Sequence, residues 1–319
     1  MKIVILGAGG VGGYIGARLA AAGQEVTFVA RGAHLDAIRK RGLLIRSALG
    51  DVHLSQARAV GSVDEAHDAE LVVVAVKLWD TESAAKQLQR KAQRGATVVS
   101  FQNGVEKDDL LRRYVPADSI MGGVCYIASV ISSPGVITHN GKMQRLVFGE
   151  YDGKMSERAL RFLEACGSAG IEAEVSTNIE KAIWEKFVLL VGLSGATSTI
   201  RQSLGPILAD SHARALFAGL MQEAAEIGRQ RGVDIARDFV TERLTFCESL
   251  PQTMTSSMHH DLESGHRLEM PWLSGYVADA GAESHIPTPY NAAVRSILSI
   301  YANGSAATPH QSDDGRARS

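Results

Sequence analysis

The stretch "VILGAGGVGGYIGARLA", residues 4–20, joins a short apolar run to a helical pattern through a glycine-rich turn. In the spacing Gly-x-Gly-x-x-Gly, the first glycine permits a tight turn and the second lets the backbone approach a pyrophosphate, while the third lets helix and strand pack closely. Because backbone amides at the helix start face the phosphate charge, the pattern predicts a dinucleotide site. The alternative is a glycine-rich turn with a structural role. The residues expected at this site are Gly7, Gly9, Gly10, Val11 and Gly12.

Short β-branched runs alternate with helical patterns through the first half of the chain. Runs that are apolar at every position suit strands covered on both faces, as in a parallel sheet. We therefore expect an α/β domain with a Rossmann-type, doubly wound parallel sheet. The predicted strands are Lys2–Leu6, Glu25–Ala30, Leu71–Val76, Thr97–Phe101 and Ile120–Tyr126, and the predicted helices include Val11–Ala22, Thr81–Arg94 and Glu106–Tyr114.

The pattern of apolar residues in the sequence changes near Ser176. Before that point, Val136–His139 and Gln144–Gly149 are predicted to form a hairpin across "NGKM". Beyond it the β-branched runs vanish and only helical patterns follow. We expect a nucleotide-binding domain over residues 1–176, an all-α domain over 177–303 and a disordered polar tail over 304–319. The predicted helices of the second domain are Asn178–Leu193, Ala213–Arg231, Ala236–Leu250, Glu269–Ala282 and Tyr290–Tyr301.

Composition excludes several classes of function. The chain has 319 residues, of which 45% are hydrophobic and 21% charged, an ordinary globular balance with room for two domains. The formal net charge is −2 without a long basic run, so nucleic acid is not expected as a partner. No stretch reaches the ~20 apolar residues of a membrane span. The N-terminal apolar run is too short for a secretion signal, and we expect a cytoplasmic protein without membrane association.

The three cysteines, Cys125, Cys166 and Cys247, are widely spaced and form neither a metal-ligand pair nor a disulfide pattern. Buried thiols in a reducing compartment are expected. His259 and His260 are adjacent and would point to different faces of a helix, so no metal site is expected.

The predicted second strand ends in "FVAR", residues 28–31. An NAD site usually places Asp or Glu at this strand tip to bind the ribose 2′-hydroxyl, whereas Arg31 suits a 2′-phosphate. One such contact is worth roughly 1.5–3 kcal/mol, so we expect NADPH to be favoured over NADH by at least about tenfold. The alternative is that Arg31 is a solvated surface residue.

Three further polar residues stand where chemistry is expected. Lys77 and Asn103 follow the third and fourth predicted strands, and open α/β sheets bind ligands at such strand ends. Lys77 suits a coenzyme phosphate or ribose, and Asn103 suits the nicotinamide or substrate, although each could also face solvent. Lys186 immediately precedes the run "FVLLVGLSGAT" of residues 187–197, in which every residue is apolar or small. From the residues alone, an ordinary lysine in a first helical turn is the alternative to a catalytic amine.

These landmarks resemble the ketopantoate reductases (2-dehydropantoate 2-reductases) over nearly the whole chain, residues 1–301. Besides the glycine loop, they are "VKLWD", "QNG", "HNGK", "IWEKF", "SSMHHDLESGHRLE" and "IPTPYN". The resemblance implies an NADPH-dependent reductase with a Rossmann domain and a helical C-terminal domain. It implies that Lys186 is the general acid, that Glu269 binds and orients the substrate, and that Ser257 binds the substrate carboxylate. It also implies that Asn103 lies by the nicotinamide and substrate and that Lys77 contacts the coenzyme.

The sequence departs from the family at several substrate-binding positions. The family usually carries asparagine at the positions of Leu190 and Ser194, often asparagine at that of Met254 and typically aspartate at that of Pro271. Ser194 is smaller than the usual asparagine but still polar, and we expect it to contact the substrate. Ketopantoate carries a terminal hydroxyl, and each buried polar group without a partner costs roughly 1–3 kcal/mol.

The leading expectation is reduction of ketopantoate to pantoate, a step of pantothenate biosynthesis. One alternative is the same chemistry on a less polar 2-oxo acid or another carbonyl compound. Another is a non-catalytic NADP(H)-binding sensor, which would have no need of the general acid. The apolar helix faces suit a homodimer as well as packing between domains, and periodicity does not distinguish the two.

Overall fold

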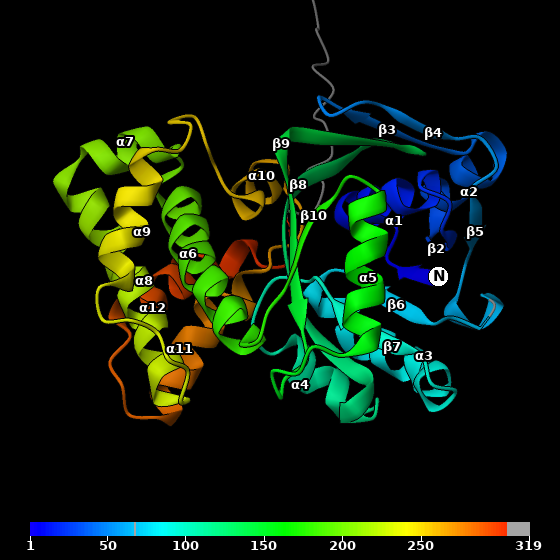
Figure 1. The fold of residues 1–319 in the computed structure, drawn as a ribbon. Helices are drawn as coiled ribbons and strands as arrows, with labels where there is room; N and C mark the ends of the chain where they lie inside the picture. The colour runs from blue at the N-terminus through cyan, green and yellow to red at the C-terminus, as the bar shows by residue number, and fades with distance from the viewer. Residues whose placement is uncertain (67, 305–319) are drawn as a thin grey trace, which may run out of the picture. The chain divides into compact units, whose positions relative to one another are not determined.

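A computed structural model describes residues 1–66 and 68–304 of the chain (Figure 1). The chain forms two compact units, of which the first comprises Met1–Phe187 with Val233–Ile235. The second comprises Val188–Gly232 and the described residues from Ala236 onward. This division falls inside helix α6 (Ile179–Ile200), whereas the expected boundary after residue 176 precedes that helix. The expected disordered tail lies outside the described residues except for Gly304.

The first unit is built on one mixed sheet with strand order β4-β3-β9-β8-β7-β6-β1-β2-β5, and β10 pairs with β9. From β8 to β5 the neighbouring strands run parallel, while β8–β9 and β3–β4 are antiparallel. The expected α/β class is confirmed. The strands are β1 (Lys2–Leu6), β2 (Glu25–Val29), β3 (Leu43–Ser47), β4 (Val52–Leu54), β5 (Arg58–Val60), β6 (Leu71–Val74), β7 (Thr97–Ser100), β8 (Ile120–Ser133), β9 (Val136–Gly149) and β10 (Glu172–Val175).

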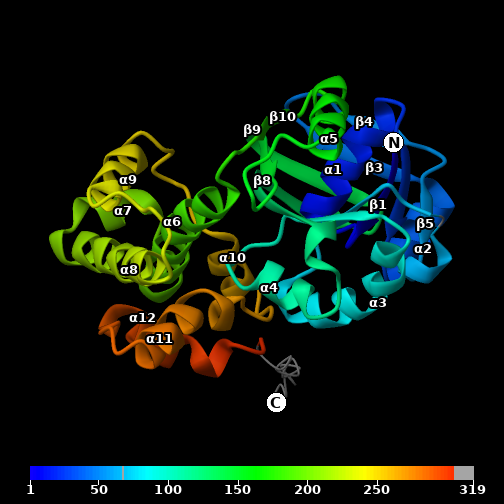
Figure 2. The ribbon, with the colours of Figure 1, turned by 60° about the horizontal axis from the view of Figure 1, so that its bottom comes forward.

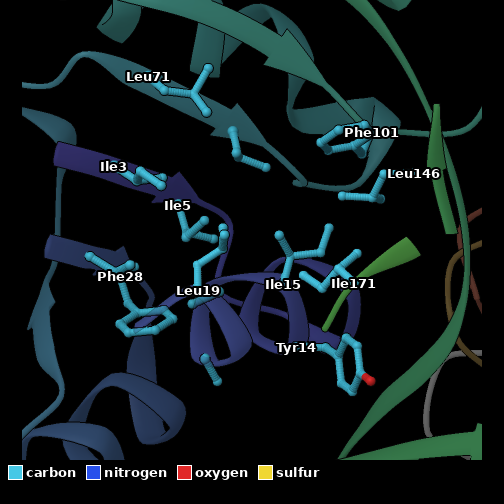
Figure 3. Packing of buried hydrophobic residues seen from close by; sticks show 14 of the residues in the cluster. Ile3, Ile5, Tyr14, Ile15, Leu19, Phe28, Leu71, Phe101, Leu146 and Ile171 are labelled. Carbon is cyan, nitrogen blue, oxygen red and sulfur yellow. The ribbon is translucent and has the colours of Figure 1, made fainter. Parts of the chain in front are cut away.

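The central strands are buried on both faces, which explains their uninterrupted apolar sequences. Ile3 and Ile5 of β1 point to the side of helix α1 (Gly10–Ala21), where they join a cluster with Ile15 and Leu19 (Figure 3). The alternate residues of β1 join the opposite cluster, with Leu88 of helix α3 (Thr81–Gln93). Helices on both faces of the parallel strands make the doubly wound arrangement. The remaining helices of this unit are α2 (Gly32–Arg41), α4 (Lys107–Arg112) and α5 (Glu157–Ser168), with short 3-10 turns η1 (Val63–Glu65), η2 (Leu78–Asp80) and η3 (Ala117–Ser119).

The predicted hairpin across "NGKM" is wrong. Its two halves belong to one strand, β9, which pairs antiparallel with β8 over most of its length, as the long green arrows of Figure 1 show. The register shifts at this point, because Ile127 pairs with Gln144 whereas Ser129 pairs with His139. Gly141 has φ 82° within the intervening residues. The glycine therefore serves a bulge in a continuing strand and not a chain reversal.

The second unit is helical, as expected, and Figure 2 shows α8 running beside α11 and α12. Close approach of these helices depends on glycine. A Cβ on Gly219 of α8 would lie 2.5 Å from the ring of Tyr290, and one on Gly192 of α6 would lie 2.5 Å from Met221. Besides part of α6, the unit contains α7 (Leu204–Ala209), α8 (Ser211–Gln230), α9 (Phe239–Glu248), α10 (Ser257–Glu263), α11 (Ser274–Glu283), α12 (Pro289–Leu298), η4 (Met270–Trp272) and η5 (Ser299–Tyr301).

Candidate functional site

The glycine-rich turn lies at the carboxyl end of β1, as the motif predicts. Gly7 has φ 101°, a conformation that favours glycine. The backbone amides of Gly7 and Ala8 donate to the carbonyl of Val29 at 3.3 and 2.9 Å, which ties the turn to the end of β2. The Nε2 atom of His34 hydrogen-bonds the carbonyl of Ala8 at 2.9 Å. These hydrogen bonds hold the turn against the end of β2 and the start of α2.

The glycines of this loop have different surroundings. A Cβ on Gly12 would lie 2.2 Å from the carbonyl oxygen of Gly7, so this glycine is needed for α1 to pack on β1. A Cβ on Gly10 would lie 2.1 Å from the carbonyl oxygen of Ser129 in β8. A Cβ on Gly9 would meet no described atom within 4 Å. The backbone at Gly9 is thus open to a ligand, and the turn and the start of α1 fit a pyrophosphate.

Arg31 and Lys77 follow strands β2 and β6, which lie on either side of β1 in the sheet. Arg31 follows β2, and its Nη1 atom lies 3.5 Å from Oδ2 of Asp80, which ends η2. Its side chain is 64% exposed, so it is open to a ligand phosphate. Lys77 precedes η2, with its Nζ atom 5.6 Å from the ring centroid of Trp79. Both cations therefore lie at the carboxyl ends of the parallel strands, on the same side of the sheet as the glycine turn.

The loops after β6 and β7 are joined by a buried hydrogen-bond network centred on Gln102. Its Nε2 atom donates to the carbonyl of Val76 at 2.9 Å and to Oγ1 of Thr81 at 2.8 Å. Ser100 donates to Oε1 of Gln102 at 3.0 Å, and Lys107 donates to the carbonyl of Ser100 at 3.1 Å. The network fixes the backbone on either side of Lys77 and immediately before Asn103.

Lys186 and Asn103 are brought together. The Nζ atom of Lys186 donates to Oδ1 of Asn103 at 2.9 Å and lies 5.8 Å from the ring centroid of Tyr126. Burial raises the pKa of the neighbouring Cys125 thiol to about 11, and the positive charge of Lys186 opposes that rise. The amide of Asn103 thus holds the ammonium beside the carboxyl end of β7, within the same unit as the glycine turn.

The other predicted site residues belong to the second unit. Ser257 is the first residue of α10 and is exposed, whereas Glu269 is buried at the start of η4. Ser194 is fully buried in α6, and its hydroxyl has no hydrogen-bond partner within residues 1–66 and 68–304. One helical turn later, Oγ1 of Thr197 lies 2.9 Å from Oγ of Ser256. The structure therefore places the start of α10 beside the turn of α6 that carries Ser194.

His259 strengthens the same contact between α6 and α10. Its Nδ1 atom lies 2.8 Å from the carbonyl of Thr197, and its Nε2 atom lies 3.1 Å from Oε1 of Glu263. Both ring nitrogens thus face protein oxygens and are engaged in structure. Among the described residues, no group of three or more His, Cys, Asp or Glu could hold a metal ion.

Several residues of the site were not singled out from the sequence. Asp80 lies within the quoted motif "VKLWD", but only the fold shows that it reaches Arg31. Tyr126 is the last residue of a predicted strand. Its position beside Lys186 depends on the packing of α6 against the sheet, which the sequence does not give. Gln102 stands next to Asn103 in "QNG", and a buried amide in that motif could have indicated an anchored loop. None of the described helices combines the length and the apolar character that crossing a membrane requires.

Two family models match the chain, one described as ketopantoate reductase PanE/ApbA over residues 3–153 and one as its C-terminal domain over residues 178–302. An uncharacterised oxidoreductase of Bacillus subtilis is 31% identical over 94% of this chain and 99% of its own. The 2-dehydropantoate 2-reductase of Halobacterium salinarum is 29% identical over 91% of this chain and 95% of its own. The crystal structure of 2-dehydropantoate 2-reductase from Geobacter metallireducens, 27% identical, matches with a TM-score of 0.87 over 94% of this chain and 99% of that one.

Proposed function

The chain belongs to the ketopantoate reductase PanE/ApbA family, and from that premise we propose that it reduces ketopantoate to pantoate with NADPH. As a member of this family the chain is an NADP-dependent oxidoreductase acting on CH–OH groups. One observation supports our assignment of the reaction to particular residues. It is the contact between Lys186 and Asn103 in the unit that also carries the glycine turn.

Reduction of a 2-oxo acid needs a hydride at the carbonyl carbon and a proton at its oxygen. NADPH supplies the hydride when it is bound. Negative charge then grows on the carbonyl oxygen, and a positioned ammonium stabilises that charge and donates the proton. Lys186 is the group we assign to this step. Asn103 limits the positions that the ammonium can occupy, because its Oδ1 accepts a hydrogen bond from Nζ at 2.9 Å.

We assign the coenzyme to the glycine turn, with Arg31 for the 2′-phosphate and Lys77 for a phosphate or ribose. Support comes from the open backbone at Gly9 and the exposed guanidinium of Arg31. Arginine suits a phosphate because its planar donors bind two oxygens at once. Asn103 is assigned to the nicotinamide and substrate as well as to Lys186.

Substrate contacts are assigned to the second unit. Ser257 would bind the substrate carboxylate, since it stands exposed at the first residue of α10, next to the capping residue Ser256. Glu269 would orient the substrate. Ser194 would contribute its hydroxyl, which has no partner among the residues described, and a buried hydroxyl without a partner is costly.

The finer question is which 2-oxo acid the chain reduces. Leu190 and Met254 replace asparagines that the family commonly carries, so fewer groups are available for the terminal hydroxyl of ketopantoate. The second candidate is therefore the same reaction on a less polar 2-oxo acid. A site built to bind a hydroxyl discriminates by about 10⁴-fold or more against a substrate that lacks it, whereas an apolar site does not.

A matched pair of substrates distinguishes the two candidates. Ketopantoate and 3,3-dimethyl-2-oxobutanoate differ only by the terminal hydroxyl. Oxidation of NADPH, followed by its absorbance, should proceed with a kcat/KM for ketopantoate well above that for the deoxy analogue. A preference for the analogue supports the less polar substrate. Tight NADPH binding without turnover on either compound or on a wider carbonyl panel would instead indicate a sensor.

A further inference from the structure

The ion pair between Arg31 and Asp80 joins two strand ends that flank the glycine turn. In the sheet, β1 lies between β2 and β6. Arg31 follows β2, Asp80 ends the 3-10 turn after β6, and Gly7 follows β1. The separation of Nη1 and Oδ2 is 3.5 Å. An acidic side chain therefore stands beside Arg31, the cation of the proposed coenzyme site at the tip of β2.

The charge on Asp80 bears on the choice of coenzyme. The 2′-phosphate of NADPH is a dianion or nearly so, and Asp80 would compete with it for Arg31 as well as repel it. NADH carries a 2′-hydroxyl at the same place, which can donate to a carboxylate. An acid at the tip of β2 usually performs that task in NAD sites. Here the tip of β2 carries arginine, and the carboxylate comes from η2 instead.

Capping of α3 does not explain the presence of Asp80. It is the N-cap residue of α3, yet its side chain makes no capping hydrogen bond. Its side chain is 34% exposed, so solvent or a ligand can reach part of it. A carboxylate at this position would weaken binding of the more highly charged coenzyme.

We propose that Asp80 is a coenzyme-selectivity residue that competes with the 2′-phosphate for Arg31 and accepts the 2′-hydroxyl of NADH. The ratio of the NADH dissociation constant to the NADPH dissociation constant is then smaller than it would be with Arg31 and no Asp80. This inference rests on the proposed coenzyme site at the glycine turn. It concerns binding, and it applies whichever 2-oxo acid is reduced.

The test is the ratio of the dissociation constants of NADH and NADPH, measured by fluorescence titration of the full-length protein without substrate. Asp80→Asn keeps the shape of the side chain and a good N-cap residue while removing the charge. It should raise the ratio by about tenfold at low ionic strength, because removing a nearby like charge strengthens NADPH binding. The gain should shrink near 1 M salt, where the screening length is about 3 Å. Arg31→Ala should lower the ratio.

Asp64→Asn is the matched control. Asp64 pairs with Arg90 at 3.0 Å, also at the protein surface, and Arg90 lies toward the end of α3 that is distant from Asp80. This variant makes the same change in net charge and should leave the ratio unaltered. A ratio in Asp80→Asn within about twofold of the wild-type ratio overturns the inference. A wild-type protein that binds neither coenzyme rejects the proposed function itself.

Discussion

The ammonium of Lys186 lies beside the side chains of Asn103 and Tyr126, which are distant from it in the sequence. Oδ1 of Asn103 accepts a hydrogen bond from Nζ at 2.9 Å, and the ring centroid of Tyr126 lies 5.8 Å from Nζ. The charge of Lys186 in turn acts on the thiol of Cys125. A lysine side chain has many rotamers, and immobilising it costs free energy that these contacts offset. The strand-end position made Asn103 a candidate, and the family resemblance gave Lys186 its expected role. The hydrogen bond between them was not predicted, because a contact between residues so far apart in the chain leaves no periodic signal.

Asn103→Ala tests whether the amide positions the ammonium. The variant loses one charge-assisted hydrogen bond, so we expect kcat to fall by roughly 10–100-fold, in line with ~1.5–3 kcal/mol for such a bond. Steady-state rates with the preferred 2-oxo acid provide the measurement. Gln87→Ala, which alters an amide that hydrogen-bonds Ser83 of the same helix, is the control and should retain the wild-type kcat. An unchanged kcat in Asn103→Ala would remove the positioning role.

At the scale of elements, the sequence predicts best those segments that pack on both sides. Strands β1, β2, β6 and β7 were expected within two residues of their observed ends, because full burial leaves an uninterrupted apolar run. Strands β3, β4 and β5 were not expected, since polar and exposed residues interrupt their short sequences. The β8–β9 hairpin was misplaced because a bulge and a turn share the same glycine-containing pattern at Gly141.

The glycine loop offers a pair of variants that separate folding from coenzyme binding. Gly9→Ala adds a methyl group that meets no described atom within 4 Å, so the melting temperature should stay near wild type while NADPH binding weakens. Gly12→Ala forces a Cβ to within 2.2 Å of the Gly7 carbonyl oxygen, so it should lower the melting temperature as well. Thermal melts and NADPH titrations check both. A Gly9→Ala protein with wild-type NADPH affinity would place the pyrophosphate elsewhere.

For the whole molecule, the family and fold class follow from landmarks spread over both units, whereas the substrate does not. These motifs determine the backbone geometry and supply the reacting groups, and proteins of one family share both. Substrate choice depends on which polar partners surround the terminal carbon of the 2-oxo acid. Of the positions proposed to set these partners, Leu190 and Ser194 lie in α6, whereas Met254 lies in the connection between α9 and α10. A sequence pattern names such positions but does not measure the resulting difference in binding free energy.

Buried thiols make stability depend on alkaline pH. Burial raises the pKa of Cys125 to about 11 and that of Cys166 to about 12, from an ordinary value of 9.0. Above pH 9.0 the unfolded chain loses thiol protons that the folded chain retains, so the free energy of unfolding should fall as pH rises toward 11. Each thiol contributes about 1.4 kcal/mol per pH unit in that window. Denaturant titrations of wild type and Cys166→Ser check this, and an equal pH dependence in both would contradict it.

Single-turnover oxidation of bound NADPH by the 2-oxo acid tests the central claim most directly. Lys186→Met keeps a long side chain and removes the ammonium, so the rate should fall by about 10²–10⁴-fold while the NADPH dissociation constant stays near wild type. Lys181→Met, on the same helix, removes an amine that pairs with exposed Asp234 and should leave the rate unchanged. If Lys186→Met oxidises NADPH at the wild-type rate, Lys186 is not the proton donor.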